Sequence, residues 1–207
     1  MLIDHPEKAF IQELRDLGKS EDIMIDVGAN AGMYCINLAD LYPELIAVEP
    51  YPVFVQQLKA NIAKFGIKNI TIVEKAISDT RGNADFYGNF LCPSGRDCPS
   101  LKQVIGLSYE GRTKAMPLKL MNVETVTLAD IVGDRHVGLV NVDTEGNEFE
   151  VLWGAQPVMN QIDVFHVEIH DWADRKAIRD FLEGFGFARL WERGLDNRPK
   201  GWLLAQR

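Results

Sequence analysis

The chain has 207 residues, 46% of them hydrophobic, which suits one α/β domain with a full core and leaves no room for a second domain of useful size. Its 30 acidic and 22 basic side chains give a formal net charge of −8, which disfavours nonspecific nucleic-acid binding because phosphate contacts need a basic face. The first residues hold no apolar core of signal-peptide length, and no apolar run could span a bilayer. We therefore expect a single cytoplasmic domain over residues 1–207, with a small molecule as its partner and neither nucleic acid nor membrane.

Hydrophobic periodicity predicts strands that alternate with helices along most of the chain. Phe10, Leu14 and Leu17 recur at helical spacing, so an N-terminal helix is expected within residues 1–20, ahead of a strand that begins at Ile23. Further helices are expected at 31–42, 52–65, 128–132, 148–153 and 173–184, and further strands at 45–49, 70–73, 137–142, 162–169, 187–191 and 202–205. The last two strands are joined by a polar loop and are expected to form an antiparallel hairpin at the sheet edge. The pattern predicts an α/β protein with seven main strands, most of them parallel.

A segment rich in proline and glycine, residues 88–120, interrupts this alternation. It is too long for an ordinary connection, and loops of this length are usually functional or disordered, so we expect an inserted loop that serves as a substrate lid. Its basic residues outnumber Asp97 and Glu110 by three and would attract an anionic acceptor: Arg96, Lys102, Arg112, Lys114 and Lys119. A solvated face that neutralises acidic neighbours is an equally good explanation.

The first strand runs into a glycine turn, Gly28 to Gly32, and the next strand ends on Glu49. This arrangement is typical of a nucleotide-type site at the carboxyl edge of a parallel sheet. The turn has the spacing Gly28-x-x-x-Gly32 in place of G-x-G-x-x-G, which argues against a dinucleotide. Asp26 would be awkward beside a diphosphate but suits an amino-acid ammonium, and Glu49 can accept hydrogen bonds from both ribose hydroxyls. S-Adenosylmethionine carries both groups, so it is the expected cofactor.

Candidates for a general base follow the fourth and fifth strands. Asp143 ends the fourth strand, and Glu145 lies in the loop just past it, where catalytic residues of open sheets collect. Glu168 and His170 lie two residues apart and so point to one face of the sheet, and His170 is the group that ordinarily titrates near neutral pH. Glu148 is better explained as a carboxylate at a helix N-terminus. The same side chains could bind Mg²⁺ or Mn²⁺, but their spacing does not require a metal and we assign no metal ligand.

Three separated pieces of the sequence resemble the FkbM family of class I S-adenosylmethionine-dependent methyltransferases. They are Asp26 to Gly32 (DVGANAG), Val48 to Pro50 (VEP), and Asn141 to Glu148 (NVDTEGNE), which is similar to that family's D-x-E-G-x-E signature. The resemblance implies a Rossmann-like sheet in the order 3-2-1-4-5-7-6 with helices on both faces. It also implies O-methylation of a hydroxyl on a sugar, polyketide or similar metabolite.

Carried onto matching positions, the resemblance implies which residues bind the cofactor. The methionine part would be surrounded by Asp26, Gly28, Ala29, Asn30 and Gly32, and the ribose would be bound at Glu49 and Pro50. Ala76 and Ile77 would border the adenine, and Asp143 would face the sulfonium. The predicted catalytic residues are Asp143, Glu145 and His170.

Two alternatives stay open on the sequence alone. A protein could bind the cofactor or a related nucleoside without turning it over, although such a protein has no need of the clustered Asp143, Glu145 and His170. A nicotinamide-dependent oxidoreductase is disfavoured by the missing G-x-G-x-x-G.

Overall fold

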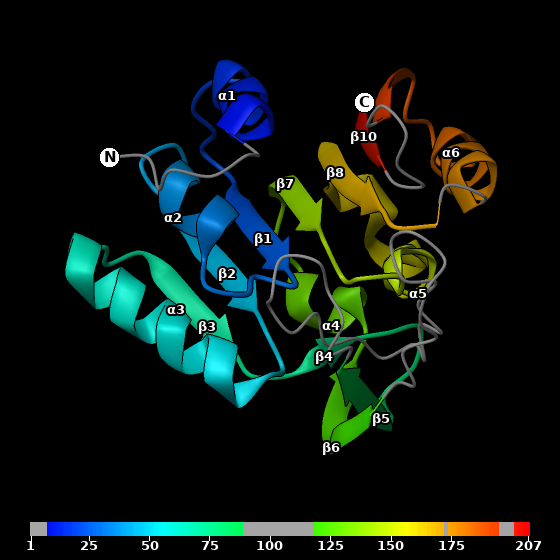
Figure 1. Ribbon diagram of the computed structural model, residues 1–207. Coiled ribbons are helices and arrows are strands. Elements are labelled where there is room, and N and C mark those ends of the chain that lie inside the picture. Colours follow the sequence, from blue (N-terminus) through cyan, green and yellow to red (C-terminus); the bar gives the residue numbers. More distant parts are fainter. Residues whose placement is uncertain (1–7, 89–117, 172–173, 195–200) are drawn as a thin grey trace.

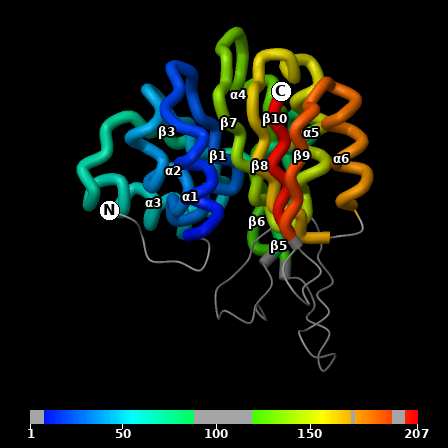
Figure 2. The backbone as a smooth tube through the Cα atoms, turned by 90° about the horizontal axis from the view of Figure 1, so that it is seen from above, coloured from blue at the N-terminus to red at the C-terminus, as the bar shows by residue number. Residues whose placement is uncertain are grey.

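In the computed structural model, which describes residues 8–88, 118–171, 174–194 and 201–207, the main sheet has seven strands in the order β3-β2-β1-β7-β8-β10-β9 (Figures 1 and 2). The strands are β1 (Ile23–Val27), β2 (Leu45–Val48), β3 (Ile70–Val73), β7 (Val137–Val142), β8 (Val164–Ile169), β9 (Arg189–Gly194) and β10 (Gly201–Gln206). The first five of these in the spatial order are parallel, and β10 pairs antiparallel with β8 and β9. Counted along the chain within this sheet, the order is the expected 3-2-1-4-5-7-6, with the edge hairpin in place.

Helices cover both faces of the main sheet, as predicted. They are α1 (Lys8–Asp16), α2 (Met33–Leu38), α3 (Pro52–Phe65), α4 (Leu128–Val132), α5 (Glu148–Trp153), a 3-10 helix η1 (Gln156–Gln161) and α6 (Arg175–Gly184). Every residue of β1, β7 and β8 is buried, which is typical of parallel strands covered on two sides. Alternate residues of β1 accordingly belong to different cores, Ile25 with α4, α5 and α6 and Met24 with α1, α2 and α3.

A second sheet of three strands was not predicted. It has the order β4-β6-β5, formed by β4 (Ala76–Ile77), β5 (Gly82–Gly88) and β6 (Leu118–Val126), and lies below the main sheet in Figure 1. Only one face of β6 is well buried, with Val123 and Thr125 inside and Asn122 and Glu124 exposed, so its sequence is too polar to read as a core strand.

The second sheet changes the limits of the predicted inserted loop. Gly88 ends β5 and residues 118–120 belong to β6, where Gly88 pairs with Leu118. Residues 89–117, which carry the expected lid and most of its basic side chains, lie outside the described part of the chain. Lys119 lies on β6 and forms an ion pair with Asp85 at 2.7 Å, so its charge is already matched.

Several element boundaries differ from those expected. Helix α2 starts at Met33 and not at residue 31, because Asn30 and Gly32 have positive φ angles of 50° and 94°, which lie outside the right-handed helical region. Strand β9 starts two residues late, at Arg189. Among the described helices, none combines the length and the apolar character needed to cross a bilayer.

Candidate active site

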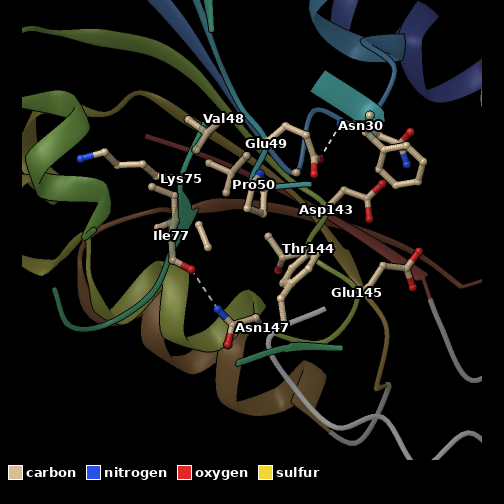
Figure 3. A pocket seen from close by; sticks show the side chains of 15 residues that line it. Asn30, Val48, Glu49, Pro50, Lys75, Ile77, Asp143, Thr144, Glu145 and Asn147 are labelled. Carbon is tan, nitrogen blue, oxygen red and sulfur yellow. Dashed lines mark hydrogen bonds between the residues drawn. The ribbon is translucent and has the colours of Figure 1, made fainter. Parts of the chain in front are cut away.

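A pocket of about 590 Å³ of empty volume opens at the carboxyl ends of β1, β2 and β7, beside β4 and β5 of the second sheet. Figure 3 shows Glu49, Asp143 and Glu145 on one side of it, with Lys75 on the opposite side. Its lining consists of Val27, Gly28, Asn30, Val48, Glu49, Pro50, Phe54, Lys75, Ala76, Ile77, Phe86, Asp143, Thr144, Glu145 and Asn147. The pocket therefore lies where parallel strand ends converge, the usual place for a ligand in this class of sheet.

The pocket brings together most of the residues that the sequence singled out. Those that line it are Gly28, Asn30, Glu49, Pro50, Ala76, Ile77, Asp143 and Glu145. Four others do not: Asp26, Ala29, Gly32 and His170. Phe54, Lys75 and Phe86 line it without having been predicted, while Thr144 and Asn147 fall inside the D-x-E-G-x-E piece.

Glu49 is 5% exposed and is fixed by backbone donors from both neighbouring turns. Its Oε2 accepts a hydrogen bond from the Asn30 N–H at 2.9 Å, and its Oε1 accepts one from the Tyr51 N–H at 2.8 Å. Burial raises the pKa of Glu49 to about 7, although both amide donors oppose that shift. Each carboxylate oxygen has a second lone pair, so Glu49 can still accept hydrogen bonds from a ligand in the pocket.

Gly28, which lines the pocket, also has a structural role. A Cβ built on it would lie 1.8 Å from the carbonyl oxygen of Asp143, at a φ of 79°. The missing side chain therefore lets the ends of β1 and β7 approach each other, and a substitution would displace backbone before it met any ligand. Gly32 is similar, since a Cβ there would lie 2.5 Å from the Leu58 side chain of α3.

Asp26 is only 1% exposed and faces into the protein, beneath the pocket. Its Oδ2 accepts a hydrogen bond from the Cys35 N–H at 3.0 Å, and its Oδ1 accepts one from Asn141 Nδ2 at 2.8 Å. Burial raises the pKa of Asp26, and these donors oppose the shift. Asp26 therefore supports the start of α2 and does not line the pocket, and its contact with the cofactor stays a prediction.

Behind Asp143 and Glu145, His170 lies among four carboxylates. Its Nδ1 lies 3.0 Å from Oε1 of Glu148, and its Nε2 lies 3.2 Å from Glu145 Oε2, 3.6 Å from Asp143 Oδ1 and 3.7 Å from Glu168 Oε1. Burial disfavours the imidazolium, but Glu145, Glu148 and Glu168 outweigh it and raise the pKa of His170 to about 10. His170 is thus charged at neutral pH, and the expectation of a neutral, titrating base is corrected.

Glu148 does more than begin a helix. Its Oε1 accepts hydrogen bonds from the Gly146 N–H at 2.8 Å and from Thr144 Oγ1 at 3.2 Å, in addition to its contact with His170. Burial would raise the pKa of Glu148, but the hydrogen bond with His170, the charge of His170 and the backbone N–H donors together outweigh it and lower the pKa. Glu148 therefore ties His170 to the loop that carries Glu145.

The backbone is strained on both sides of the pocket. Among the described residues, the non-glycine residues with positive φ are Asn30 at 50° and Glu145 at 55°, and both line the pocket. Such conformations persist where surrounding contacts fix them, and they concentrate at functional sites. Asn30 is held by Glu49, and the loop around Glu145 is held by Glu148.

Comparisons with known proteins show the family of this chain. The model of the FkbM methyltransferase domain matches residues 26–194. The 31-O-demethyl-FK506 methyltransferase FkbM of Streptomyces tacrolimicus is 29% identical over 197 residues, which cover 83% of this chain and 74% of that protein. The hexuronic acid methyltransferase AglP of Haloferax volcanii is 24% identical over 179 residues, which cover 85% of this chain and 67% of that protein.

A solved structure agrees at the level of the fold. TrmK of M. capricolum, in complex with S-adenosyl-homocysteine, superimposes with a TM-score of 0.58 at 9% identity, covering 100% of this chain and 69% of that one. The family match spans most of the chain, and it includes the glycine turn, Glu49 and the acidic loop of the pocket. The chain therefore belongs to the FkbM methyltransferase domain family and is an S-adenosylmethionine-dependent methyltransferase.

Proposed function

We propose that this enzyme transfers the methyl group of S-adenosylmethionine to a hydroxyl oxygen of a small metabolite, such as a sugar or a polyketide. The observation that carries the proposal is the pair Asp143 and Glu145 at the pocket wall, with the partly buried His170 beside them. The names of two relatives support it, since one names 31-O-demethyl-FK506 and the other a hexuronic acid as the substrate.

Within this proposal, the cofactor spans the pocket from β4 to the glycine turn. Ala76 and Ile77 border the adenine, the Glu49 carboxylate accepts the ribose hydroxyls, and the turn at Gly28 and Asn30 borders the methionine part. Hydrogen bonds to a carboxylate are charge-assisted, and they are stronger for a carboxylate as buried as that of Glu49. Glu49 is therefore proposed as the main polar anchor of the cofactor.

The charge that moves during methyl transfer favours Asp143 and Glu145 as residues that act on the hydroxyl of the methyl acceptor and not on the cofactor. The sulfonium loses its positive charge in the transition state, so a carboxylate beside it would mainly stabilise the reactants. The attacking hydroxyl becomes positive and more acidic, so a carboxylate beside that oxygen stabilises the transition state and takes its proton. His170, already protonated, positions these carboxylates and does not accept the proton itself.

The binding of the cofactor should depend on the protonation of Glu49. Ribose hydroxyls donate to the carboxylate, so only deprotonated Glu49 binds well, and its pKa is about 7. Affinity for S-adenosylhomocysteine should then fall about tenfold between pH 8 and pH 6, because the fraction of deprotonated Glu49 falls by that factor. Calorimetric titration at both pH values measures the change. Glu49→Gln is the control and should bind weakly with little pH dependence; an equal pH dependence in that variant would assign the effect to another group.

The metal hypothesis is tested separately. Asp143, Glu168 and His170 lie close enough to share an ion, but Mg²⁺ or Mn²⁺ would need a neutral His170, which its carboxylate neighbours oppose. We expect that dialysis against a chelator leaves the rate of methyl transfer within about twofold of the untreated enzyme. A loss of activity that Mg²⁺ or Mn²⁺ restores would contradict this and would make the cluster a metal site.

The charge of the acceptor depends on residues outside the described part of the chain. An anionic acceptor stays our proposal on the strength of Arg96, Lys102 and Arg112 in the 88–120 segment. The part of the pocket wall that the structure describes carries the carboxylates of Glu49, Asp143 and Glu145. An anionic acceptor would therefore place its hydroxyl at Asp143 and its negative group towards the 88–120 segment. Replacing the three basic residues by Gln should raise the acceptor KM and reduce its salt dependence.

The experiment that tests the function follows the methyl group. S-Adenosylmethionine with an isotopically labelled methyl is incubated with a panel of sugars, uronic acids and polyketide alcohols, each paired with its derivative blocked at the hydroxyl. Label should appear only on compounds with the free hydroxyl. Label on nitrogen or carbon would overturn O-methylation, and tight cofactor binding with no label on any compound would favour the non-catalytic alternative.

A further inference from the structure

A row of three buried polar side chains crosses the main sheet beneath the pocket. Asp26 of β1 is in register with Asn141 of β7, and Asn141 is in register with His166 of β8. They are 1%, 1% and 4% exposed, and they lie on the face covered by α1 and α2, where the Phe10 and Tyr34 rings pack near His166. Buried polar groups are costly unless they are hydrogen-bonded, so a row like this needs every partner in place.

Along the row, each hydrogen bond is donated towards Asp26, from His166 to Asn141 and from Asn141 to Asp26. A carboxylate accepts only, so the amide group of Asn141 must present Nδ2 to Asp26, at 2.8 Å. This leaves Asn141 Oδ1 facing His166 Nδ1 at 2.6 Å, and that nitrogen must therefore carry the proton. Burial lowers the pKa of His166 to about 4, which keeps the ring neutral with its single proton available for Nδ1.

Without a donor at residue 166, Asn141 Oδ1 is left buried without its hydrogen-bond partner. An Asn141 side chain that shifts to satisfy Oδ1 elsewhere would withdraw Nδ2 from the buried Asp26 carboxylate. Asp26 would then move, and its second oxygen would lose the Cys35 N–H at the start of α2. This matters for the pocket, because Asp26 lies two residues before Gly28, and Asn141 two residues before Asp143.

We propose that His166 is a positioning residue for cofactor binding, which acts through Asn141 and Asp26 on the glycine turn and the start of α2. It lies outside the pocket lining and outside the three pieces that resemble the family signatures. The proposal needs only the cofactor and not the identity of the acceptor.

The experiment compares His166→Leu with His166→Asn. The two side chains are nearly the same size and shape, but Asn carries an amide nitrogen where His carries Nδ1 and Leu carries a methyl group. We expect His166→Asn to bind S-adenosylhomocysteine within about threefold of the parent protein, and His166→Leu to bind it about tenfold more weakly. The melting temperatures of the two variants should be similar, because the apolar Leu side chain is cheaper to bury but leaves the buried Asn141 Oδ1 without a donor.

Two variants of similar stability are thus expected to differ in affinity, which a purely structural role would not produce. Equal affinities for the two variants, or affinities that follow the melting temperatures, would overturn the proposal. Phe165→Leu, on the opposite face of β8, controls for a general disturbance of the strand and should leave affinity within about twofold. If His166→Leu fails to fold, His166→Met, which also lacks a donor, takes its place in the comparison.

Discussion

Replacing Asp143 by Asn is expected to lower turnover about a hundredfold while changing the affinity for S-adenosylhomocysteine by less than about threefold. The substitution preserves size but removes the charge that accepts the proton of the hydroxyl. Oδ1 of Asp143 lies 3.6 Å from His170 Nε2, so Asn also loses an ion-pair partner for the imidazolium. Single-turnover kinetics with a saturating acceptor measure the chemical step, and calorimetry measures the affinity.

Asp134→Asn is the matched control for Asp143→Asn, because Asp134 is exposed in the turn between α4 and β7. It should leave both quantities unchanged. If Asp143→Asn weakened binding as much as it slowed turnover, Asp143 would be a cofactor residue and Glu145 the remaining candidate for the base.

Replacing Gly28 by Ala is expected to destabilise the fold by about 2–5 kcal/mol, the sum of overpacking and a positive φ for a residue with a Cβ. The added Cβ would lie 1.8 Å from the Asp143 carbonyl oxygen, so β1 and β7 would have to separate at their ends. For a chain of this length the melting temperature should fall by roughly 5–15 °C. Because the same strand ends form the pocket wall, cofactor affinity should fall with it.

Gly66→Ala is the control that separates the backbone strain of a positive φ from the crowding caused by an added Cβ. Gly66 has a φ of 68° at the end of α3, and a Cβ there would meet nothing within 4 Å. Only the conformational cost of about 1–2 kcal/mol applies, and the pocket is not disturbed. Equal losses of stability in Gly28→Ala and Gly66→Ala would show that the close approach of β1 to β7 is not what Gly28 provides.

The order of the main sheet could be predicted because its signals are local or shared with a family. Continuous apolar runs such as Val137 to Val142 are typical of parallel strands buried on both faces, and the turn at Gly28 follows directly from β1. The edge hairpin of β9 and β10 followed from the polar loop between two short apolar runs. These features depend on neighbouring residues, so the sequence alone carries them.

The second sheet could not be predicted, because its pairing depends on contacts between distant residues. Ala76 pairs with Thr125, and Asn83 with Glu124, across a segment of polar sequence. Phe86 enters the pocket only through this sheet, so no local signal marked it. The polar alternation around Val123 was the sign that a half-exposed strand was present.

The residues of the pocket wall were predicted better than the charge state of His170. Glu49 and Asp143 follow their strands directly, so the fold alone places them in the pocket. The pKa of His170 instead depends on Glu145, Glu148 and Glu168, whose distances to its ring are set by the folded loop. The hydrogen bond of Asp26 to Asn141 could not be predicted for a related reason, because the two residues lie 115 positions apart.

Titration of S-adenosylhomocysteine into the parent protein, Glu49→Ala and Glu21→Ala tests directly whether this pocket binds the cofactor. Glu21 is exposed ahead of β1 and serves as the control for removing one carboxylate. We expect the parent protein and Glu21→Ala to bind equally, and Glu49→Ala to bind tenfold or more weakly because it loses charge-assisted hydrogen bonds to the ribose. Folded Glu49→Ala with unchanged affinity, or a parent protein that does not bind, would contradict the assignment of this pocket to the cofactor.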